Sequence, residues 1–384
     1  MLKFITASDS FKESLSAKAA CQAMTDGIKR VFPEAEVIQV PMADGGEGTV
    51  DAILSCIPGE KVEKMVTGPD GRRLLASYGL INDGECAVIE TAAASGLGLL
   101  AKKDRDPMTA TTFGTGELLL DALKRGVKKI IVGLGGSATN DGGAGLAQAL
   151  GVRFLDKNGQ ELPFGGGSLD QLARIDASGL APRLKEVEII LASDVTNPLT
   201  GLNGASAVFG PQKGADKEMV QKLDASLHHY AAVIKEQVGK DVENVPGSGA
   251  AGGLGAGFLA FSKCQMKAGA QIVIEESHLA EKMRDADYVF TGEGGIDFQT
   301  KFGKTPYAVA QVAKKLGIPV FALAGQVGDG IDSLYEAGFT GIFGILPGIC
   351  SLPEALAGGG GNLARTSENV ARVIKAARVN LHLQ

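Results

Sequence analysis

The sequence has no tryptophan, and phenylalanine and tyrosine bring its aromatic share to only 5%. No apolar run approaches the ~20 residues that a membrane-spanning helix needs, and the first residues, MLKFITASDSFKES, become polar too soon for a signal peptide. The five cysteines are widely spaced and form no CxxC pair, which favours reduced thiols. We therefore expect a cytoplasmic protein.

Clustered positive charge is also missing. The formal net charge is −6, whereas nucleic acids and membrane surfaces attract proteins with clustered lysine and arginine. Neither is an expected partner. The four histidines, at 228, 229, 278 and 382, lie outside every polar loop, which disfavours a histidine-based triad or a zinc site.

Glycine, in contrast, is abundant: 54 residues against 14 prolines, without a collagen period. Such a glycine content implies many turns where the backbone closely approaches another group, and small anions are the ligands we expect there. The length of 384 residues exceeds the usual size of one hydrophobic core. It predicts two α/β domains, or one domain with a large insertion.

The hydrophobic pattern predicts how these domains are built. A strand over 2–7, a helix and a strand over 35–40 form a unit whose crossover implies parallel pairing. The pattern of residues 62–100 predicts hairpins, which indicates a change of domain. The pattern of residues 213–280 predicts mainly helices. Strands and helices alternate most clearly over 288–346, so we expect a doubly wound parallel sheet.

The run GLGGSATNDGGAG, residues 133–145, follows a predicted buried strand at 129–132. A glycine-rich turn from strand to helix aims backbone N–H groups at an anion. Thr139, Asn140 and Asp141 add a hydroxyl, an amide and a carboxylate, as phosphate and Mg²⁺ sites do. The alternative is an ordinary strand-to-helix loop.

Two nucleotide motifs match in part. Gly133, Gly135 and Ala138 fit the dinucleotide fingerprint, and Asp156 lies at the sequence separation at which that fingerprint places a ribose contact. The fingerprint requires a helix that begins among its glycines, and residues 140–143 would weaken such a helix. A second match, at 247–252, follows a proline. The end of a Walker loop appears at 303–305, but Phe298 replaces its first glycine, so the chain is no P-loop kinase.

Other polar loops follow predicted strands, where ligands of open α/β sheets collect. They supply carboxylates and lysines, the mixture that phosphoryl transfer requires. The carboxylates are Asp9, Asp44, Glu47, Asp141, Asp194, Glu293 and Asp297, and the lysines are Lys12, Lys213 and Lys304.

These loops, taken in order, closely resemble those of the bacterial class I glycerate kinase family. The matching motifs are DSFKESLSA from Asp9, PMADGGEGT from Pro41, GLGGSATNDGGAG from Gly133, DVTNPLTG from Asp194, VFGPQKGA from Val208, PGSGAAGGLG from Pro246, and TGEG, ID, QT and GKTP between Thr291 and Pro306. The resemblance covers essentially the whole chain. Gly295 departs from it, since relatives usually carry arginine there; Lys301 or Lys304 could substitute.

The resemblance implies an ATP- and Mg²⁺-dependent kinase that converts D-glycerate to 2-phosphoglycerate. It also implies two dissimilar α/β domains with the active site in the cleft between them. One is a Rossmann-like or flavodoxin-like parallel sheet built from both chain ends, residues 1–62 plus 285–384, and the other, 63–284, is inserted. A homo-oligomer is left open.

Site roles follow as expectations. Asp194 is the first candidate for the base that accepts the hydroxyl proton, and Asp44 is the second. Lys12, with Ser10, is expected to bind the negative charge of a phosphate or carboxylate group. Further substrate-binding candidates are Asp9, Gly45, Gly46, Asn197 and Lys213. ATP-binding candidates are Gly135, Gly136, Ser137, Thr139, Asn140, Asp141, Gly142, Gly143 and Lys304. Glu293 and Asp297 are candidate metal ligands.

Two other classes of function stay open. A nicotinamide-dependent oxidoreductase of a small hydroxy acid would explain the fingerprint-like glycines. A non-catalytic ligand sensor would explain the loss of arginine at Gly295.

Overall fold

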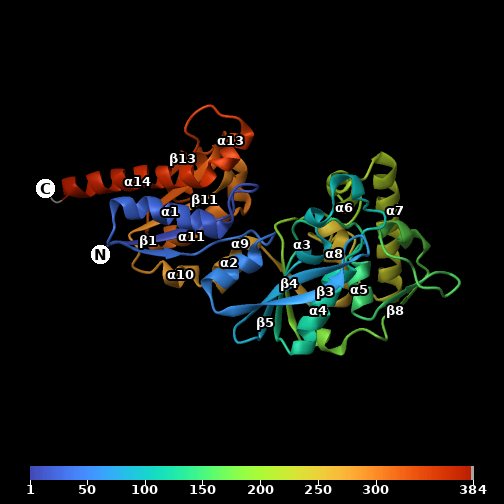
Figure 1. The fold of residues 1–384 in the computed structure, drawn as a ribbon. Helices are drawn as coiled ribbons and strands as arrows, with labels where there is room; N and C mark the ends of the chain where they lie inside the picture. Colours follow the sequence, from blue (N-terminus) through green and yellow to red (C-terminus); the bar gives the residue numbers. More distant parts are fainter. Residues whose placement is uncertain (382–384) are drawn as a thin grey trace. The chain divides into compact units, whose positions relative to one another are not determined.

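The computed structural model describes residues 1–381 and divides into two compact units (Figure 1). Unit 1 consists, among the described residues, of 1–44, 51–57 and 270–381, so segments near both ends of the chain build it. Unit 2 consists of residues 45–50 and 58–269. His382 lies outside the described residues.

Unit 1 is built on a five-stranded parallel sheet in the order β13-β12-β11-β1-β2. Its strands are β1 (Lys3–Ser8), β2 (Glu36–Gln39), β11 (Tyr288–Ile296), β12 (Val320–Val327) and β13 (Phe339–Gly344). The predicted α/β class, with a parallel sheet made from both chain ends and a second sheet inserted between them, is confirmed.

Helix α1 (Ala17–Val31) packs against the long C-terminal helix α14 (Gly359–Leu381), which Figure 1 shows lying alongside it. Ser16 caps α1 by accepting a hydrogen bond from the Ala19 amide. Close packing requires Gly27, because a Cβ there would lie 2.2 Å from the Ala364 carbonyl oxygen. The other helices are α2 (Thr49–Cys56), α9 (Gly269–Glu276), α10 (Leu279–Lys282), α11 (Thr305–Leu316), α12 (Asp332–Glu336) and α13 (Leu352–Ala357).

Several aromatic residues form a row across the sheet of unit 1. Phe4 of β1 contacts Tyr288 and Phe290 of β11, and Phe321 of β12 contacts both of those and Phe343 of β13. Ring centroids lie 5.4–6.4 Å apart. One row of rings therefore crosses four neighbouring strands and supplies much of the core beneath α1 and α14.

Unit 2 is built on a mixed sheet in the order β10-β9-β6-β5-β4-β3. Its strands are β3 (Gly59–Thr67), β4 (Arg73–Ile81), β5 (Cys86–Glu90), β6 (Lys129–Gly133), β9 (Glu188–Ala192) and β10 (Cys264–Lys267). The hairpins predicted for 62–100 are the antiparallel pairs β3-β4 and β4-β5. A separate antiparallel pair joins β7 (Arg153–Leu155) to β8 (Arg174–Asp176).

The helices of unit 2 are α3 (Thr91–Ser95), α4 (Phe113–Arg125), α5 (Ala144–Ala149), α6 (Ala205–Phe209), α7 (Lys217–Gln237) and α8 (Ala250–Phe261). Strand β10 interrupts the stretch 213–280, which was predicted as mainly helical. Helix α8 begins in the small-residue run after Pro246, where Ala251, Gly252 and Gly253 have positive φ. Within residues 1–381 no helix is both long and apolar enough to cross a membrane. The domain boundaries expected from the sequence, 1–62 plus 285–384 and 63–284, stay a prediction.

Candidate active site

In unit 1, candidate residues gather where β1 and β11 end and α11 begins. Asp9 follows β1, and its backbone N–H donates to the Gly292 carbonyl of β11 at 2.9 Å. Its carboxylate accepts hydrogen bonds from the Ser10 amide at 2.6 Å and from the Thr305 hydroxyl at 2.6 Å. Burial raises the pKa of Asp9 to about 6, and the nearby negative charge of Asp44 raises it further. The hydrogen bonds from Thr305 and Ser10 act in the opposite direction.

Glu293 lies on β11 and belongs to the same group. Its Oε1 atom is buried and accepts no hydrogen bond from residues 1–381, while the Lys304 ammonium lies 3.5 Å away. Burial raises the pKa of Glu293 to about 7; Lys304 opposes the shift, and Asp9 and Asp44 add to it. A mostly buried carboxylate with an unused oxygen beside a lysine is a strong candidate for binding a cation or a proton.

The remaining candidates of unit 1 have other surroundings. Asp297 caps the short 3₁₀ helix Phe298–Phe302, because its carboxylate accepts from the Gln299 amide at 2.8 Å. Lys304 donates to the Gly295 carbonyl at 3.1 Å. Lys12 and Asp44 are exposed. The structure thus brings Asp9, Ser10, Glu293 and Lys304 together and turns Asp297 toward its own helix.

The glycine run of unit 2 is held by close backbone packing. A Cβ on Gly133 would lie 2.3 Å from the Gly45 carbonyl oxygen, and one on Gly135 would lie 2.8 Å from the Gly46 Cα. Residues 137–145 are buried, and the exposed part of the run is Gly136, with Gly135 half-buried. Glycine is therefore required at several of these positions to admit neighbouring backbone.

Asp141 satisfies the backbone of this run. Its buried carboxylate accepts hydrogen bonds from the Thr112 amide at 2.8 Å, the Thr112 hydroxyl at 2.9 Å, the Gly143 amide at 3.1 Å and the Gly145 amide at 3.2 Å. Burial raises the pKa of Asp141, and these hydrogen bonds oppose the shift. Both oxygens are occupied by the protein's own donors.

Lys213 ends the short helix Pro211–Lys213 and is fully buried. Its ammonium donates to the Ser137 hydroxyl at 2.9 Å and to the Thr139 carbonyl at 2.6 Å. Burial lowers the pKa of Lys213 to about 7, and the Asp141 carboxylate opposes that shift. Lys213 therefore ties the start of the buried segment in place.

Three further candidates of unit 2 have local partners. The Asn140 amide group donates to the Ser206 hydroxyl at 2.9 Å and is buried. The Asn197 side chain donates to the Asn203 carbonyl at 2.8 Å. Exposed Asp194 accepts from the Gly269 amide at 3.3 Å.

Sequence reasoning missed two hydroxyls. Thr305, whose side chain bonds Asp9, was visible as the last residue of the incomplete Walker loop. Thr112 links the Asp141 carboxylate to the Leu146 amide, which donates to the Thr112 hydroxyl at 2.9 Å. Nothing local in the sequence signals that second link, since its partners lie about 30 positions further along the chain.

The dinucleotide alternative requires a helix that begins among the glycines. Helix α5 begins later, at Ala144, and Asp156 forms an exposed turn with Asn158 and Gln160. Carboxylates and a lysine at the C-terminal edge of a parallel α/β sheet supply the groups that phosphoryl transfer requires.

The chain belongs to the glycerate kinase family, whose model matches residues 4–375. It is 50% identical over 373 residues to the glycerate 2-kinase of Escherichia coli K12, covering 97% of this chain and 98% of that protein. It is 49% identical to a glycerate kinase of Halalkalibacterium halodurans, with the same coverage. A crystal structure assigned as glycerate kinase 2 from Salmonella typhimurium LT2 matches with a TM-score of 0.88 and 47% identity over 98% of this chain and 99% of that one.

Proposed function

We propose that this protein is a cytoplasmic kinase that transfers the terminal phosphate of ATP to D-glycerate and releases 2-phosphoglycerate and ADP. One observation carries the proposal. A buried carboxylate with an unused oxygen, Glu293, lies beside Lys304 and Asp9 in a chain that is 50% identical over nearly its full length to a glycerate 2-kinase. The phosphate donor, ATP, follows from the kinase family.

Mg²⁺ is the cation we propose for Glu293. Mg²⁺ usually takes one or two protein carboxylates and completes its shell with water and phosphate oxygens. The residues fit that pattern, because the buried Glu293 Oε1 accepts no hydrogen bond within residues 1–381 and lies 3.5 Å from the Lys304 ammonium. When bound, the metal would neutralise charge on the ATP phosphates. Asp297, engaged as a cap, is the weaker of the two proposed ligands.

Lys304 is the phosphate partner we propose in unit 1. It stands at the N-terminal end of α11, a helix of twelve residues, where the helix dipole also favours an anion. In unit 2 we propose that the backbone N–H groups of Gly135 and Gly136 donate hydrogen bonds to the ATP phosphates, since these are the accessible residues of the glycine run. Ser137 to Gly143 would then hold the loop in shape.

The proton of the glycerate hydroxyl needs an acceptor in reach of the substrate. Asp194 is our first candidate and Asp44 the second, because both are exposed carboxylates next to glycine or small polar residues. Replacing the true base by asparagine should lower kcat far more than it changes the KM for glycerate. Equal, modest losses for Asp194→Asn and Asp44→Asn would reject both.

The direct experiment measures ADP formed from ATP and Mg²⁺ with D-glycerate, with L-glycerate and without acceptor. ³¹P NMR of the product then separates 2- from 3-phosphoglycerate. ADP formation that does not depend on glycerate would reject the kinase proposal, and glycerate-dependent reduction of NAD(P)⁺ would favour the oxidoreductase. Binding of glycerate without turnover would favour the sensor.

A matched pair of variants tests the site itself. Glu293→Gln keeps the shape of the side chain but removes its charge, so we expect weaker Mg²⁺ dependence and loss of turnover. Glu281→Gln changes an exposed glutamate of the same unit, on α10, and should leave both unaffected. If both variants kept wild-type rates and Mg²⁺ dependence, the metal role of Glu293 would be wrong.

A further inference from the structure

Arg105 of unit 2 follows the short 3₁₀ helix Lys102–Asp104, and within residues 1–381 its guanidinium has no carboxylate partner. One of its N–H groups donates to the Gln212 carbonyl at 3.3 Å, and another donates to the Leu97 carbonyl at 3.5 Å. The Nε atom is buried and has no acceptor in the described part of the chain. A guanidinium has more N–H donors than these two. This half-buried cation therefore keeps donors unused and bonds only neutral oxygens.

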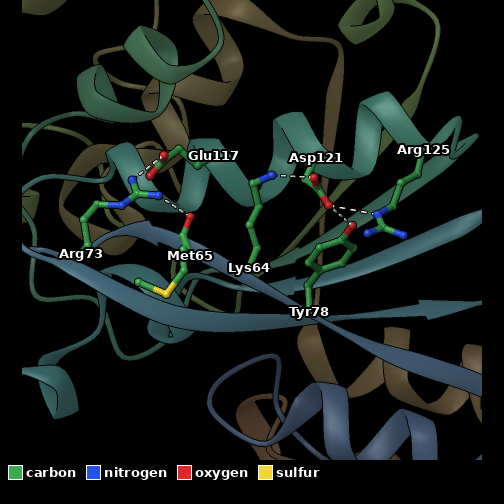
Figure 2. A network of polar contacts seen from close by, with 7 residues as sticks. All are labelled: Lys64, Met65, Arg73, Tyr78, Glu117, Asp121 and Arg125. Atoms are coloured by element: carbon green, nitrogen blue, oxygen red, sulfur yellow. Dashed lines mark hydrogen bonds and ion pairs between the residues drawn. The ribbon is translucent and has the colours of Figure 1, made fainter.

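Two exposed arginines of the same unit are neutralised, as Figure 2 shows. Arg73 pairs with Glu117 at 2.8 Å, and Arg125 pairs with Asp121 at 3.0 Å. An exposed cation gains little from a carboxylate, because water already stabilises its charge. Arg105 is more buried than either, and arginine cannot lose a proton to remove its charge. Its position therefore favours an anion that comes from outside the chain.

The acidic neighbours of Arg105 in the sequence do not supply this anion. Asp106 accepts hydrogen bonds from the Met108 amide at 2.9 Å and from the Thr109 hydroxyl at 2.8 Å, so it stabilises its own turn. Asp104 is exposed, and in the described structure it forms no ion pair with Arg105. The positive charge of the guanidinium is therefore uncompensated on both sides along the chain.

Arg105 lies beside the accessible tip of the glycine run, because both of its acceptors belong to segments that contact this tip. Leu97, which accepts from Arg105, donates its own amide to the Gly136 carbonyl at 2.8 Å. Gln212 precedes Lys213, whose ammonium donates to the hydroxyl of the next residue of the run at 2.9 Å. The guanidinium is thus held next to the exposed residue of the run.

Two features prepare Arg105 to bind an anion there. Its backbone is fixed by close packing, since Gly214 has a φ of +100° and a Cβ at this position would lie 2.6 Å from the Arg105 carbonyl oxygen. Its charge is permanent, whereas burial lowers the pKa of the neighbouring Lys213 to about 7. Arg105 is therefore a positioned cation that stays charged at every pH at which the protein is folded.

We propose that Arg105 binds the phosphate groups of ATP, next to the backbone N–H groups of Gly135 and Gly136. A guanidinium and backbone amides both donate strong hydrogen bonds to phosphate oxygens, and together they surround an anion from two sides. The inference rests on the proposed function, which supplies ATP as the ligand. The carboxylate of glycerate has related chemistry, and the experiment separates the two anions.

Isothermal titration calorimetry of the full chain with ATP and Mg²⁺, in the absence of glycerate, measures binding without turnover. Arg105→Gln should raise the dissociation constant for ATP about tenfold to a hundredfold, the range of a lost hydrogen bond to a charged group. Arg105→Lys keeps the charge but not the planar fork, so its affinity should lie between the two. The KM for glycerate at saturating ATP should stay unchanged in both variants.

Arg183→Gln is the matched control. Arg183 also donates to a backbone carbonyl, that of Val127, at 3.3 Å, but it is exposed. Val127 precedes β6, whereas the glycine run follows this strand, so the control arginine lies at the opposite end of it. The control variant should bind ATP as the wild type does.

Chemical rescue separates phosphate binding from a role in folding alone. Ethylguanidinium added to Arg105→Ala should restore part of the lost ATP affinity, and it should not change the affinity of Arg183→Gln. Thermal unfolding without ligand and circular dichroism establish that each variant is folded. ATP should then raise the Tm of the wild type more than that of Arg105→Gln, because a ligand stabilises the state that it binds.

Three results would overturn the proposal: wild-type ATP affinity in Arg105→Gln, an equal loss of affinity in Arg183→Gln, or a raised KM for glycerate with unchanged ATP affinity. The last result would assign Arg105 to the glycerate carboxylate. A wild type that binds ATP but does not phosphorylate glycerate would reject the proposed function, and the comparison of variants would still decide the role of Arg105. A wild type that binds no ATP would reject both.

Discussion

Replacement of Asp141 should destabilise unit 2 strongly, because its carboxylate is the acceptor for four donors of that unit. Asp141→Ala leaves three buried amides without a partner: those of Thr112, Gly143 and Gly145. A buried donor that loses its partner costs about 1–3 kcal/mol. The upper bound is therefore about 9 kcal/mol, and we expect about 4 kcal/mol because the cavity admits water.

Asp141→Asn should cost less. With its amide oxygen at the Oδ2 position, asparagine still accepts from Thr112 and Gly145 and loses the bond from Gly143, which Oδ1 accepts. One unsatisfied amide predicts a loss of about 1–3 kcal/mol. Both losses should shrink above pH 7, because Lys213, whose pKa burial lowers to about 7, can then lose the positive charge that the Asp141 carboxylate stabilises.

Urea unfolding followed by far-UV circular dichroism measures these losses, and hydrogen exchange at Gly143 and Gly145 assigns them to this segment. Asp156→Ala is the matched control, because Asp156 also accepts backbone amides, from Asn158 and Gln160, but in an exposed turn. It should cost less than about 1 kcal/mol. If Asp141→Ala cost no more than this control, the role of the buried carboxylate as an acceptor for backbone amides would be wrong.

Three shorter predictions concern other positions. Gly133→Ala should cost about 1–3 kcal/mol in urea unfolding, because its Cβ would lie 2.3 Å from a backbone carbonyl oxygen, whereas Gly98→Ala meets nothing within 4 Å and should cost little. Lys304→Ala should raise the pKa of Glu293 above its present value of about 7 and move the acid limb of kcat/KM to higher pH; an unmoved limb contradicts this. The free energy of unfolding of the wild type should increase relative to that of Lys213→Met as pH rises above about 7, since burial lowers the pKa of Lys213 in the folded state alone.

The alternation of strands and helices could be predicted because its signals are local. An apolar strand at 2–7 and a glycine directly after several of the helices are visible within a few residues, and β1 (Lys3–Ser8) and the end of α11 at Gly317 agree with them. Strand β10 could not be predicted in this way. Its four residues, CQMK, take a strand conformation because they pair with Ile189 to Ala192 of β9.

The glycine run shows the same limit at the level of the site. Its composition correctly indicated close approach of backbone, but the partner of Gly133 and Gly135 is the segment Gly45–Gly46, about 90 positions earlier in the chain. The partner of Asp141 is likewise the distant Thr112. Sequence pattern predicts that a residue is constrained, whereas the fold decides which group constrains it.

The buried carboxylates of this protein differ in what remains for a ligand. Asp141 is fully buried, yet its oxygens already accept from protein donors, so a ligand would have to displace backbone amides. Glu293 is less buried, and its Oε1 accepts no hydrogen bond within residues 1–381, although the Lys304 ammonium lies 3.5 Å away. A buried acceptor without a donor is costly unless something else satisfies it. The open acceptor, more than the glycine-rich run, is therefore the feature that a bound cation would explain.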